Sequence, residues 1–228
     1  MVPDPHSRWY PRVVLPRLPG LLLGLVLFGA GIGQMAQAGL GLAPWEVFHQ
    51  GIGRLTGLPL GTVSILVGIP VLAGWWPLGE RPGLGTLLNI ALIGTATNLT
   101  IGLLPPASGL PAQLALMASG VVTIAIGSGL YLASDLGPGP RDGLMTGIHH
   151  RFGWSIRRAR TAIELVVLVA GFVAGGTIGL GTVVFAFGIG PLVQVALRVF
   201  DRDGRVARRR RLAQEARGVL GTRGEVAE

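Results

Sequence analysis

Long apolar stretches separated by short polar ones run through most of the chain. About 20 consecutive apolar residues are needed for an α-helix to cross the hydrocarbon core of a bilayer. The sequence contains six such stretches: Leu21–Ala38, Leu60–Trp76, Leu84–Leu104, Leu114–Ala133, Ala159–Ala174 and Leu180–Val199. They are continuous, whereas a transmembrane β-barrel would need alternating segments of about 10 residues. The pattern therefore predicts an all-α polytopic membrane protein with six transmembrane helices.

The composition supports this class and argues against a water-soluble enzyme. Half of the 228 residues are hydrophobic and only 13% are charged, compared with about 25% in soluble domains. The chain has no Cys, and all 19 of its basic residues are Arg, which excludes disulfides, Walker-type phosphate loops and Schiff-base lysines. No hydrolase or metal motif is found either. We therefore expect no enzyme activity, no catalytic residue, no metal site and no cofactor.

Arginine is distributed unevenly over the predicted loops. If the amino terminus is cytoplasmic, 18 of the 19 Arg residues lie on the cytoplasmic side and only Arg54 lies outside. This is the asymmetry that orients membrane proteins. We therefore expect residues 1–20 to form a cytoplasmic amino-terminal segment and residues 201–228 to form a basic cytoplasmic tail. The run 208–211 in this tail directly follows a span, so its expected partner is the lipid bilayer and not nucleic acid.

The sequence repeats itself at a spacing of 96 residues without gaps. Aligned identical residues include Gly24 with Gly120, Gly31 with Gly127, Pro44 with Pro140, and the tetrad Gly-Leu-Gly-Thr at 83–86 with the same tetrad at 179–182. The chain thus divides into repeat 1 (residues 21–104) and repeat 2 (residues 112–200), each with three predicted transmembrane helices. Because three is an odd number, the second repeat is predicted to be inverted in the membrane. A duplicated bundle that makes no functional use of its symmetry is the alternative.

Each repeat contains one segment that is too long for a turn, at 40–57 and 136–153. Both have Pro near the start, an acid two residues later and Gly at the end, which is typical of a helix with stop signals at both ends. About 12 helical residues extend roughly 18 Å, enough for half a membrane. The two helices either lie flat in the interface, with charges in water, or are re-entrant, with their amino-terminal ends meeting near the midplane.

The polar faces of these two short helices supply the candidate site. The predicted substrate-binding residues are Trp45, Glu46, His49, Gln50, Arg141, Asp142 and Thr146. Glu164, inside the fifth predicted span, is a candidate for ion coupling, because a carboxylate there costs roughly 2.5–3.5 kcal/mol on insertion scales. The alternative for Glu164 is a local ion pair with Arg160, four residues earlier, near the edge of the membrane.

Several strings in the chain resemble a known family. They are APWEVFHQG, GLGTLLN, SDLGPGPRDGLMTGIH, SIRRARTAIE and GTVVFAFGIGPLVQ. They are similar to segments of the bacterial YczE-like integral membrane proteins, distant relatives of the YitT group, and the resemblance covers about Leu18 to Phe200. It implies a small multi-pass protein of the bacterial plasma membrane. It supplies no substrate and no catalytic residues.

These observations predict a small secondary transporter or permease-like carrier of an unknown small molecule or ion. The inverted repeat, together with charges that packing alone would not require, motivates this hypothesis. The alternative is a non-transporting membrane scaffold that docks a cytoplasmic enzyme. Glycine pairs four residues apart, such as Gly29 and Gly33, predict close helix packing. Whether this packing lies within one chain or joins a homo-oligomer is left open by the sequence.

Overall fold

The computed structural model describes residues 11–201 and 204, and every regular element in that part of the chain is helical. The elements are α1 (Pro11–Val14), the 3₁₀ turn η2 (Leu15–Arg17), α2 (Leu18–Ala38), α3 (Pro44–Thr56), α4 (Leu60–Ala73), α5 (Leu84–Leu103), α6 (Leu110–Ser134), α7 (Pro140–Phe152), α8 (Ile156–Val173) and α9 (Leu180–Phe200). The first ten residues and nearly all of the predicted tail lie outside the described residues.

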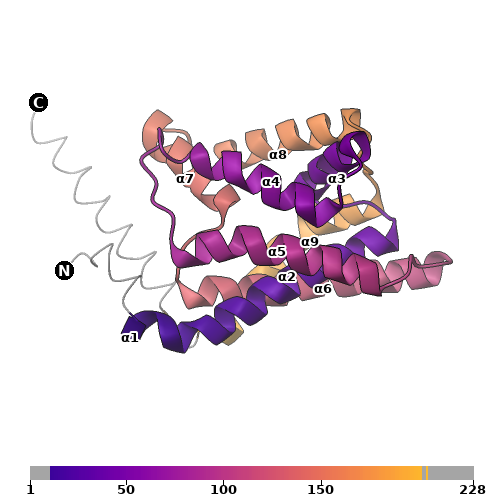
Figure 1. The fold of residues 1–228 in the computed structure, drawn as a ribbon, viewed down its shortest axis with the longest axis horizontal. Coiled ribbons are helices and arrows are strands. Elements are labelled where there is room, and N and C mark those ends of the chain that lie inside the picture. The colour runs from indigo at the N-terminus through magenta and orange to yellow at the C-terminus, as the bar shows by residue number, and fades with distance from the viewer. Residues whose placement is uncertain (1–10, 202–203, 205–228) are drawn as a thin grey trace, which may run out of the picture.

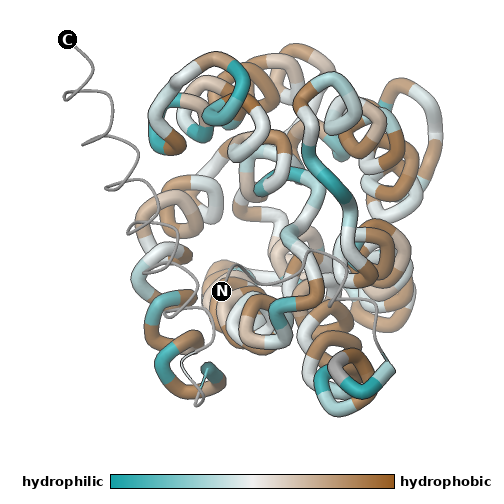
Figure 2. The backbone as a smooth tube through the Cα atoms, turned by 90° about the vertical axis from the view of Figure 1, so that its left-hand side faces the viewer, coloured by the Kyte–Doolittle hydropathy of each residue, from teal (hydrophilic) through white to brown (hydrophobic). Residues whose placement is uncertain are grey.

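Six longer helices run along the long axis of the molecule, and two short ones lie at its ends. Figure 1 shows α2, α5, α6 and α9 stretched along this axis, with α4 and α8 running in the same direction beside them. The short helices α3 and α7 lie toward opposite ends of the layer that contains α4 and α8. Seen along the long axis in Figure 2, the helices are viewed nearly end-on, and most of their residues are hydrophobic.

Four helices of the described part are long and apolar enough to cross a membrane. They are the continuous helix Leu15–Ala38, which contains α2, and α5, α6 and α9. The helices α2, α4, α5, α6, α8 and α9 all begin and end within four residues of the six predicted spans. Two of them, α4 and α8, do not have the length and composition of a membrane span by themselves. The helix α4 has only 14 residues, about 21 Å at 1.5 Å per residue, and it forms a pair with α3 that is bent by 109°.

The early end of α4 has a local cause. Pro70 lies inside the helix near its end and has no backbone N–H to donate to the preceding turn. Trp75 and Trp76, which the sequence assigned to the span, lie in the turn that follows. The helix α8 has 18 residues, and three Arg and Glu164 lie in its first half, so it is amphipathic. The predicted span already contains Arg160 and Glu164.

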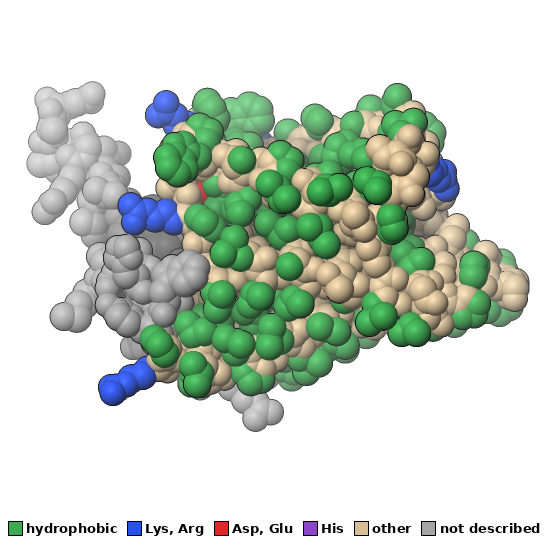
Figure 3. All heavy atoms as spheres, viewed as in Figure 1, with side chains coloured by type: hydrophobic (Ala, Val, Ile, Leu, Met, Phe, Trp, Pro, Cys, Tyr) green, Lys and Arg blue, Asp and Glu red, His purple; other side chains and the backbone are tan. Residues whose placement is uncertain are grey.

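Large apolar side chains cover the outside of the bundle. Among those that are exposed are Leu66, Leu87, Val122, Phe187 and Val195, which lie on four different helices. Figure 3 shows hydrophobic side chains over the middle of one face, with basic side chains at its two ends. An apolar belt between charged ends is the surface that a bilayer requires.

The helix bounds follow the 96-residue spacing of the sequence. The short helices α3 and α7 both have 13 residues, and each has Pro at its start, an acid in its first turn and a Gly with positive φ just after its end. These Gly residues are Gly57 (φ 75°) and Gly153 (φ 70°), where a side chain would be strained. The predicted start and stop signals of both short helices are confirmed.

The first helices of the two halves cross each other in antiparallel directions through glycine. A Cβ added at Gly31 would lie 2.7 Å from the carbonyl oxygen of Gly120, and one added at Gly127 would lie 2.6 Å from that of Gly24. As residue numbers rise along α2 they therefore fall along α6. Such close approach of two backbones requires glycine. Gly29 and Gly33 instead pack against α5, so this glycine pair serves packing within the chain.

Each half also holds the loop that leads into the short helix of the other half. The amide of Gly85, at the start of α5, donates to the carbonyl of Leu136 (3.0 Å), and the amide of Gly181, at the start of α9, donates to the carbonyl of Leu40 (2.7 Å). The Thr86 hydroxyl adds a bond to the carbonyl of Pro138 (2.7 Å). These bonds satisfy backbone groups of the two loops, and they fix where α3 and α7 begin.

Candidate functional site

The amino-terminal ends of α3 and α7 are joined by an ion pair. The guanidinium of Arg141, on the first turn of α7, donates to a carboxylate oxygen of Glu46, on the first turn of α3, at 2.5 Å. The Glu46 side chain is only 4% exposed and that of Arg141 is 29% exposed. The same guanidinium lies over the ring of Trp45, 5.0 Å from its centroid, within the range of a cation–π contact. Three predicted site residues therefore meet in space.

Helix stability explains the position of Glu46 but not that of Arg141. An acid in the first turn of a helix is favourable, because the amino-terminal end carries a partial positive charge. Glu46 satisfies this rule, but Arg141 violates it, since a cation in the first turn is repelled by the same partial charge. The buried carboxylate of Glu46 needs a counter-charge, and Arg141 supplies it from the other half of the chain.

Two buried side chains on the same face of α3 carry polar atoms without a partner. The indole nitrogen of Trp45 and the Nδ1 atom of His49 are buried, and neither has a hydrogen-bond partner in the described part of the chain. His49 is 2% exposed, and its ring packs against Trp45 and Phe48. Trp45 and Glu46 are also buried, so neither side chain lies on the outer surface of the bundle. Buried polar groups without a partner are rare in proteins and call for an explanation.

Asp142, next to Arg141, has a different environment. It is exposed, and its carboxylate accepts a hydrogen bond from the hydroxyl of Tyr131 on α6 at 3.1 Å. That hydroxyl also accepts a bond from the amide of Gly139. On the other side of the helix start, the indole of Trp75 donates to the carbonyl of Pro140 at 3.0 Å. The start of α7 is thus held from two sides by aromatic side chains.

Sequence reasoning missed Tyr131 and Trp75. Tyr131 lies within an apolar run, and Trp75 near the end of another, and neither has a polar neighbour that signals a site. A buried Tyr or Trp usually needs a partner for its polar atom, and that rule is the one signal that the sequence offered for them.

The remaining predicted residues serve other contacts. Gln50 accepts a bond from the amide of Thr177 at 2.6 Å, and the Thr146 hydroxyl bonds to carbonyls of its own helix. Glu164 pairs with Arg160 at 2.9 Å, with 34% of its side chain exposed. This geometry matches the local ion pair that was the alternative reading of Glu164.

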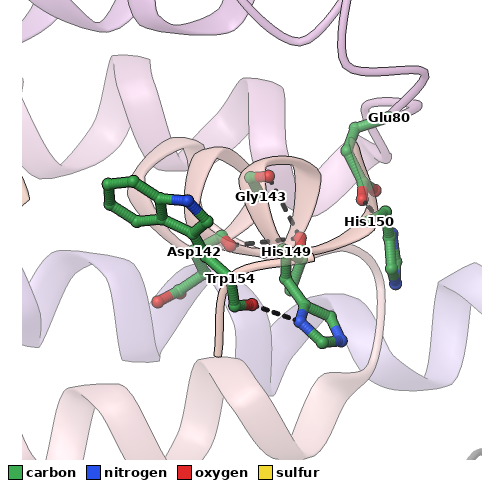
Figure 4. Close-up of polar contacts among 7 residues, drawn as sticks. Glu80, Asp142, Gly143, His149, His150 and Trp154 are labelled. Carbon is green, nitrogen blue, oxygen red and sulfur yellow. Dashed lines mark hydrogen bonds and ion pairs between the residues drawn. The ribbon is translucent and has the colours of Figure 1, made fainter. Parts of the chain in front are cut away.

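A second polar cluster lies at the carboxyl-terminal end of α7. His150 Nδ1 lies 3.0 Å from Glu80, in the turn before α5, and His149 Nδ1 lies 2.5 Å from the carbonyl oxygen of Trp154. Figure 4 shows Glu80 facing His150, while the side chain of Asp142 points away from this pair. No group of three His, Asp or Glu side chains in the described part is placed to hold a metal ion.

A cavity of about 330 Å³ opens at the far end of α3. It is lined by Gln50, Gly53, Arg54, Gly57, Leu58 and Leu60. Arg54 closes one side by donating to the carbonyl of Gly175 and to the Thr177 hydroxyl, the latter at 3.1 Å. Because Glu46, Gln50 and Arg54 are spaced four residues apart, they lie along one face of α3. The cavity therefore begins about one turn from Glu46 along the same polar stripe.

Comparison with known proteins places most of the chain in one group of sequences. Residues 15–198 match a family of unknown function (DUF6198). The chain is 42% identical to an uncharacterized protein of Haemophilus influenzae over 182 residues, which is 80% of this chain and 84% of that protein. It is 34% identical to the uncharacterized membrane protein YczE of Bacillus subtilis over 76% of this chain and 82% of that protein. The protein YyaS of the same organism is 25% identical over 79% of this chain and 92% of that protein.

The resemblance to YczE-like proteins is thus confirmed, and no solved structure matches the chain significantly. The four long apolar helices and the similarity to a membrane protein agree on a multi-pass membrane protein.

Proposed function

Because the chain belongs to this family of proteins of unknown function, we propose a role from its own site. We propose that it is a small carrier, a secondary transporter or permease, of the bacterial plasma membrane with both termini in the cytoplasm. Its substrate site lies where the amino-terminal ends of α3 and α7 meet. The proposal assigns no catalytic step to the protein.

The helix directions support an inverted arrangement of the two halves. The glycine contacts show that α2 runs antiparallel to α6 and parallel to α5. They also show that α4 runs antiparallel to α5. A unit whose longer helices run up, down and up leaves the membrane on the side opposite to its entry. Carriers with inverted halves place their substrate near the middle of the bilayer, at broken or half-membrane helices.

The observation that carries the proposal is the Glu46–Arg141 ion pair. It joins the two 13-residue helices α3 and α7, one from each half, and Glu46 is buried. Replacing a buried ion pair by apolar residues is often neutral or stabilising, so packing does not require these charges. A charged pair at the contact between two opposed half-helices is suited to bind a polar solute and to open as the halves move.

The unpartnered atoms of Trp45 and His49 support the same site. A solute with acceptor atoms would satisfy the indole N–H of Trp45, which can only donate, and the Nδ1 atom of His49 in the tautomer that carries a proton there. The polar stripe from Glu46 to Arg54 leads from this site to the cavity at the far end of α3. That stripe is the path that the proposal assigns to the solute.

The transport test uses the full-length protein in proteoliposomes. Solid-supported-membrane electrophysiology would measure currents after jumps of succinate, alanine and choline, which represent anionic, zwitterionic and cationic solutes. We expect a transient current with at least one of them, and we expect Glu46→Gln to abolish it while Arg160→Gln preserves it. The carrier proposal would be refuted if the folded wild-type protein gave no current with any of the three solutes. It would also be refuted if Glu46→Gln gave the same current as the wild type.

His49→Leu separates a binding role from a packing role. The substitution removes a buried nitrogen without a partner, a group whose burial costs about 1–3 kcal/mol. We therefore expect an unchanged or higher unfolding temperature in detergent together with loss of the solute-induced current. A drop in stability with normal current would show that His49 serves packing alone.

Single-cysteine labelling tests the inverted arrangement, since the chain has no Cys of its own. Thr56 and Arg151, both exposed, lie in the last turns of α3 and α7. We expect a membrane-impermeant maleimide to label Thr56→Cys from outside the cell and Arg151→Cys only in inverted vesicles. Labelling of both variants from one side would contradict the arrangement.

A further inference from the structure

We propose that the corner between α7 and α8 binds the phosphate headgroup of an anionic glycerophospholipid. The site lies away from the Glu46–Arg141 pair, and it does not depend on whether the protein transports a solute. It is formed by one face of the first half of α8 and by the residue that precedes its amino-terminal cap.

A cavity of about 450 Å³ marks this corner. It is lined by Trp154, Arg157, Arg158, Thr161, Ala162 and Leu165. Their spacing of three and four residues places them along a single stripe of the helix. Within about three turns, the stripe changes from two guanidinium groups to a hydroxyl and then to apolar side chains. This is the order of polarity that a phospholipid presents from its headgroup to its acyl chains.

Both Arg side chains are available for an anion. Arg157 and Arg158 are exposed, and neither takes part in any ion pair found among the described residues. The acid on the same helix, Glu164, is engaged by Arg160. The first turn of α8 contains no acid, so two cations lie at the end of the helix dipole that disfavours them. An external anion would relieve this repulsion, and guanidinium groups match the oxygen geometry of phosphate.

The Ser155 side chain occupies one of the backbone donors that an anion could otherwise use. Its hydroxyl accepts a bond from the amide of Arg158, so it already caps one of the free N–H groups of the first turn. The guanidinium groups, and not this amide, are therefore the donors left for a ligand. A zwitterionic headgroup would bring its own cation next to them, which disfavours choline lipids at this site.

The apolar side of α8 continues the site toward the membrane interior. Leu165, Val169, Phe172 and Val173 are 55%, 60%, 60% and 81% exposed, and they follow the cavity along the helix. Trp154, half exposed at 49%, has the amphipathic ring that is typical of the membrane interface. Acyl chains that lie on this stripe would cover apolar surface while the phosphate stays with the two Arg residues, so the occupant is a lipid.

Native mass spectrometry of the full-length protein in detergent tests the site. The probes are phosphatidylglycerol, phosphatidylcholine and inorganic phosphate. We expect binding of phosphatidylglycerol to be tighter than that of phosphatidylcholine, and Arg157→Gln/Arg158→Gln to weaken it about tenfold to thirtyfold, as expected when two Arg near a membrane surface are lost. The matched control Arg81→Gln/Arg198→Gln removes the same charge from two exposed positions elsewhere and should change binding less than twofold.

Three outcomes would overturn the site. If Arg157→Gln/Arg158→Gln and Arg81→Gln/Arg198→Gln weakened phosphatidylglycerol binding equally, the lipid would be attracted by the overall charge of the protein and not by this site. Equal binding of phosphatidylcholine would mean nonspecific lipid contact, and inorganic phosphate binding as tightly as the lipid would mean a soluble anion as the ligand. The variant Arg157→Lys/Arg158→Lys keeps both positive charges and serves as a control for misfolding of the Gln variant. It should retain part of the preference for phosphatidylglycerol, and a complete loss in this folded variant would also count against the proposal.

Discussion

Arg141→Met is expected to lower the free energy of unfolding by about 3–5 kcal/mol, the range for breaking a buried ion pair from one side. The substitution leaves the Glu46 carboxylate, 4% exposed, without a counter-charge in an apolar bundle. It also removes the cation from the face of Trp45. Reversible unfolding in mixed micelles, followed by tryptophan fluorescence, measures the change.

Two further variants decide whether the Glu46–Arg141 ion pair is responsible for the expected loss of stability. Glu46→Gln combined with Arg141→Met removes both charges and should recover part of the lost stability, because no uncompensated carboxylate remains. Arg160→Gln breaks an exposed pair four residues apart on a helix and should cost about 0.5 kcal/mol or less. If Arg141→Met were no more damaging than Arg160→Gln, the ion pair would not hold α3 and α7 together.

Gly127→Ala is expected to destabilise the protein by about 1–3 kcal/mol, as overpacking does. The new Cβ would lie 2.6 Å from both the Gly24 carbonyl oxygen and the Phe28 amide nitrogen. These are backbone atoms of α2, so α2 and α6 must separate to admit a methyl group. Gly31→Ala, the substitution 96 residues earlier, meets the Gly120 carbonyl oxygen at 2.7 Å and should have an effect of similar size.

Gly188→Ala is the matched control for this prediction. It lies inside α9, and a Cβ there would meet nothing within 4 Å, so the change should stabilise the helix by roughly 0.5–1 kcal/mol. The same unfolding measurement compares the three variants. Equal effects at Gly127 and Gly188 would show that the close crossing of α2 and α6 does not limit stability.

The predictions for Arg141→Met and Gly127→Ala both depend on how the two halves of the chain dock against each other. The crossing of α2 and α6 places the two halves against each other, and the loops before α3 and α7 are each bonded to the last helix of the opposite half. The Glu46–Arg141 contact therefore forms only when both halves are correctly docked. Disturbing the glycine crossing should affect the candidate site as well as stability.

The elements of the fold were largely predictable. Apolar runs located α2, α5, α6 and α9, because each needs enough apolar length to cross a bilayer. Proline, a first-turn acid and a terminal glycine located α3 and α7, because these residues act on the backbone within one or two turns. At α4 the predicted start is confirmed, but the apolar run continues to Trp76 whereas the helix ends at Ala73, soon after Pro70.

The candidate site was predictable only in part. The polar face of α3 pointed to Glu46, and the first turn of α7 pointed to Arg141, but their pairing was not predictable. The repeat aligns Glu46 with Asp142 and Trp45 with Arg141, so symmetry alone would suggest other partners. The contacts of Tyr131 and Trp75 with the start of α7 and the burial of the unpartnered nitrogen of His49 depend on how separate helices pack against one another.

Local chemistry along the chain determined the helical class, the apolar spans, the ends of the short helices and the 96-residue repeat, since each depends on residues within a few turns of one another. Tertiary packing decided which charges are buried, which aromatic rings hold the start of α7, and that Glu46 meets Arg141. The reason is that burial and pairing depend on distances between segments nearly a hundred residues apart, and those distances are set by how closely the glycine faces of the helices pack.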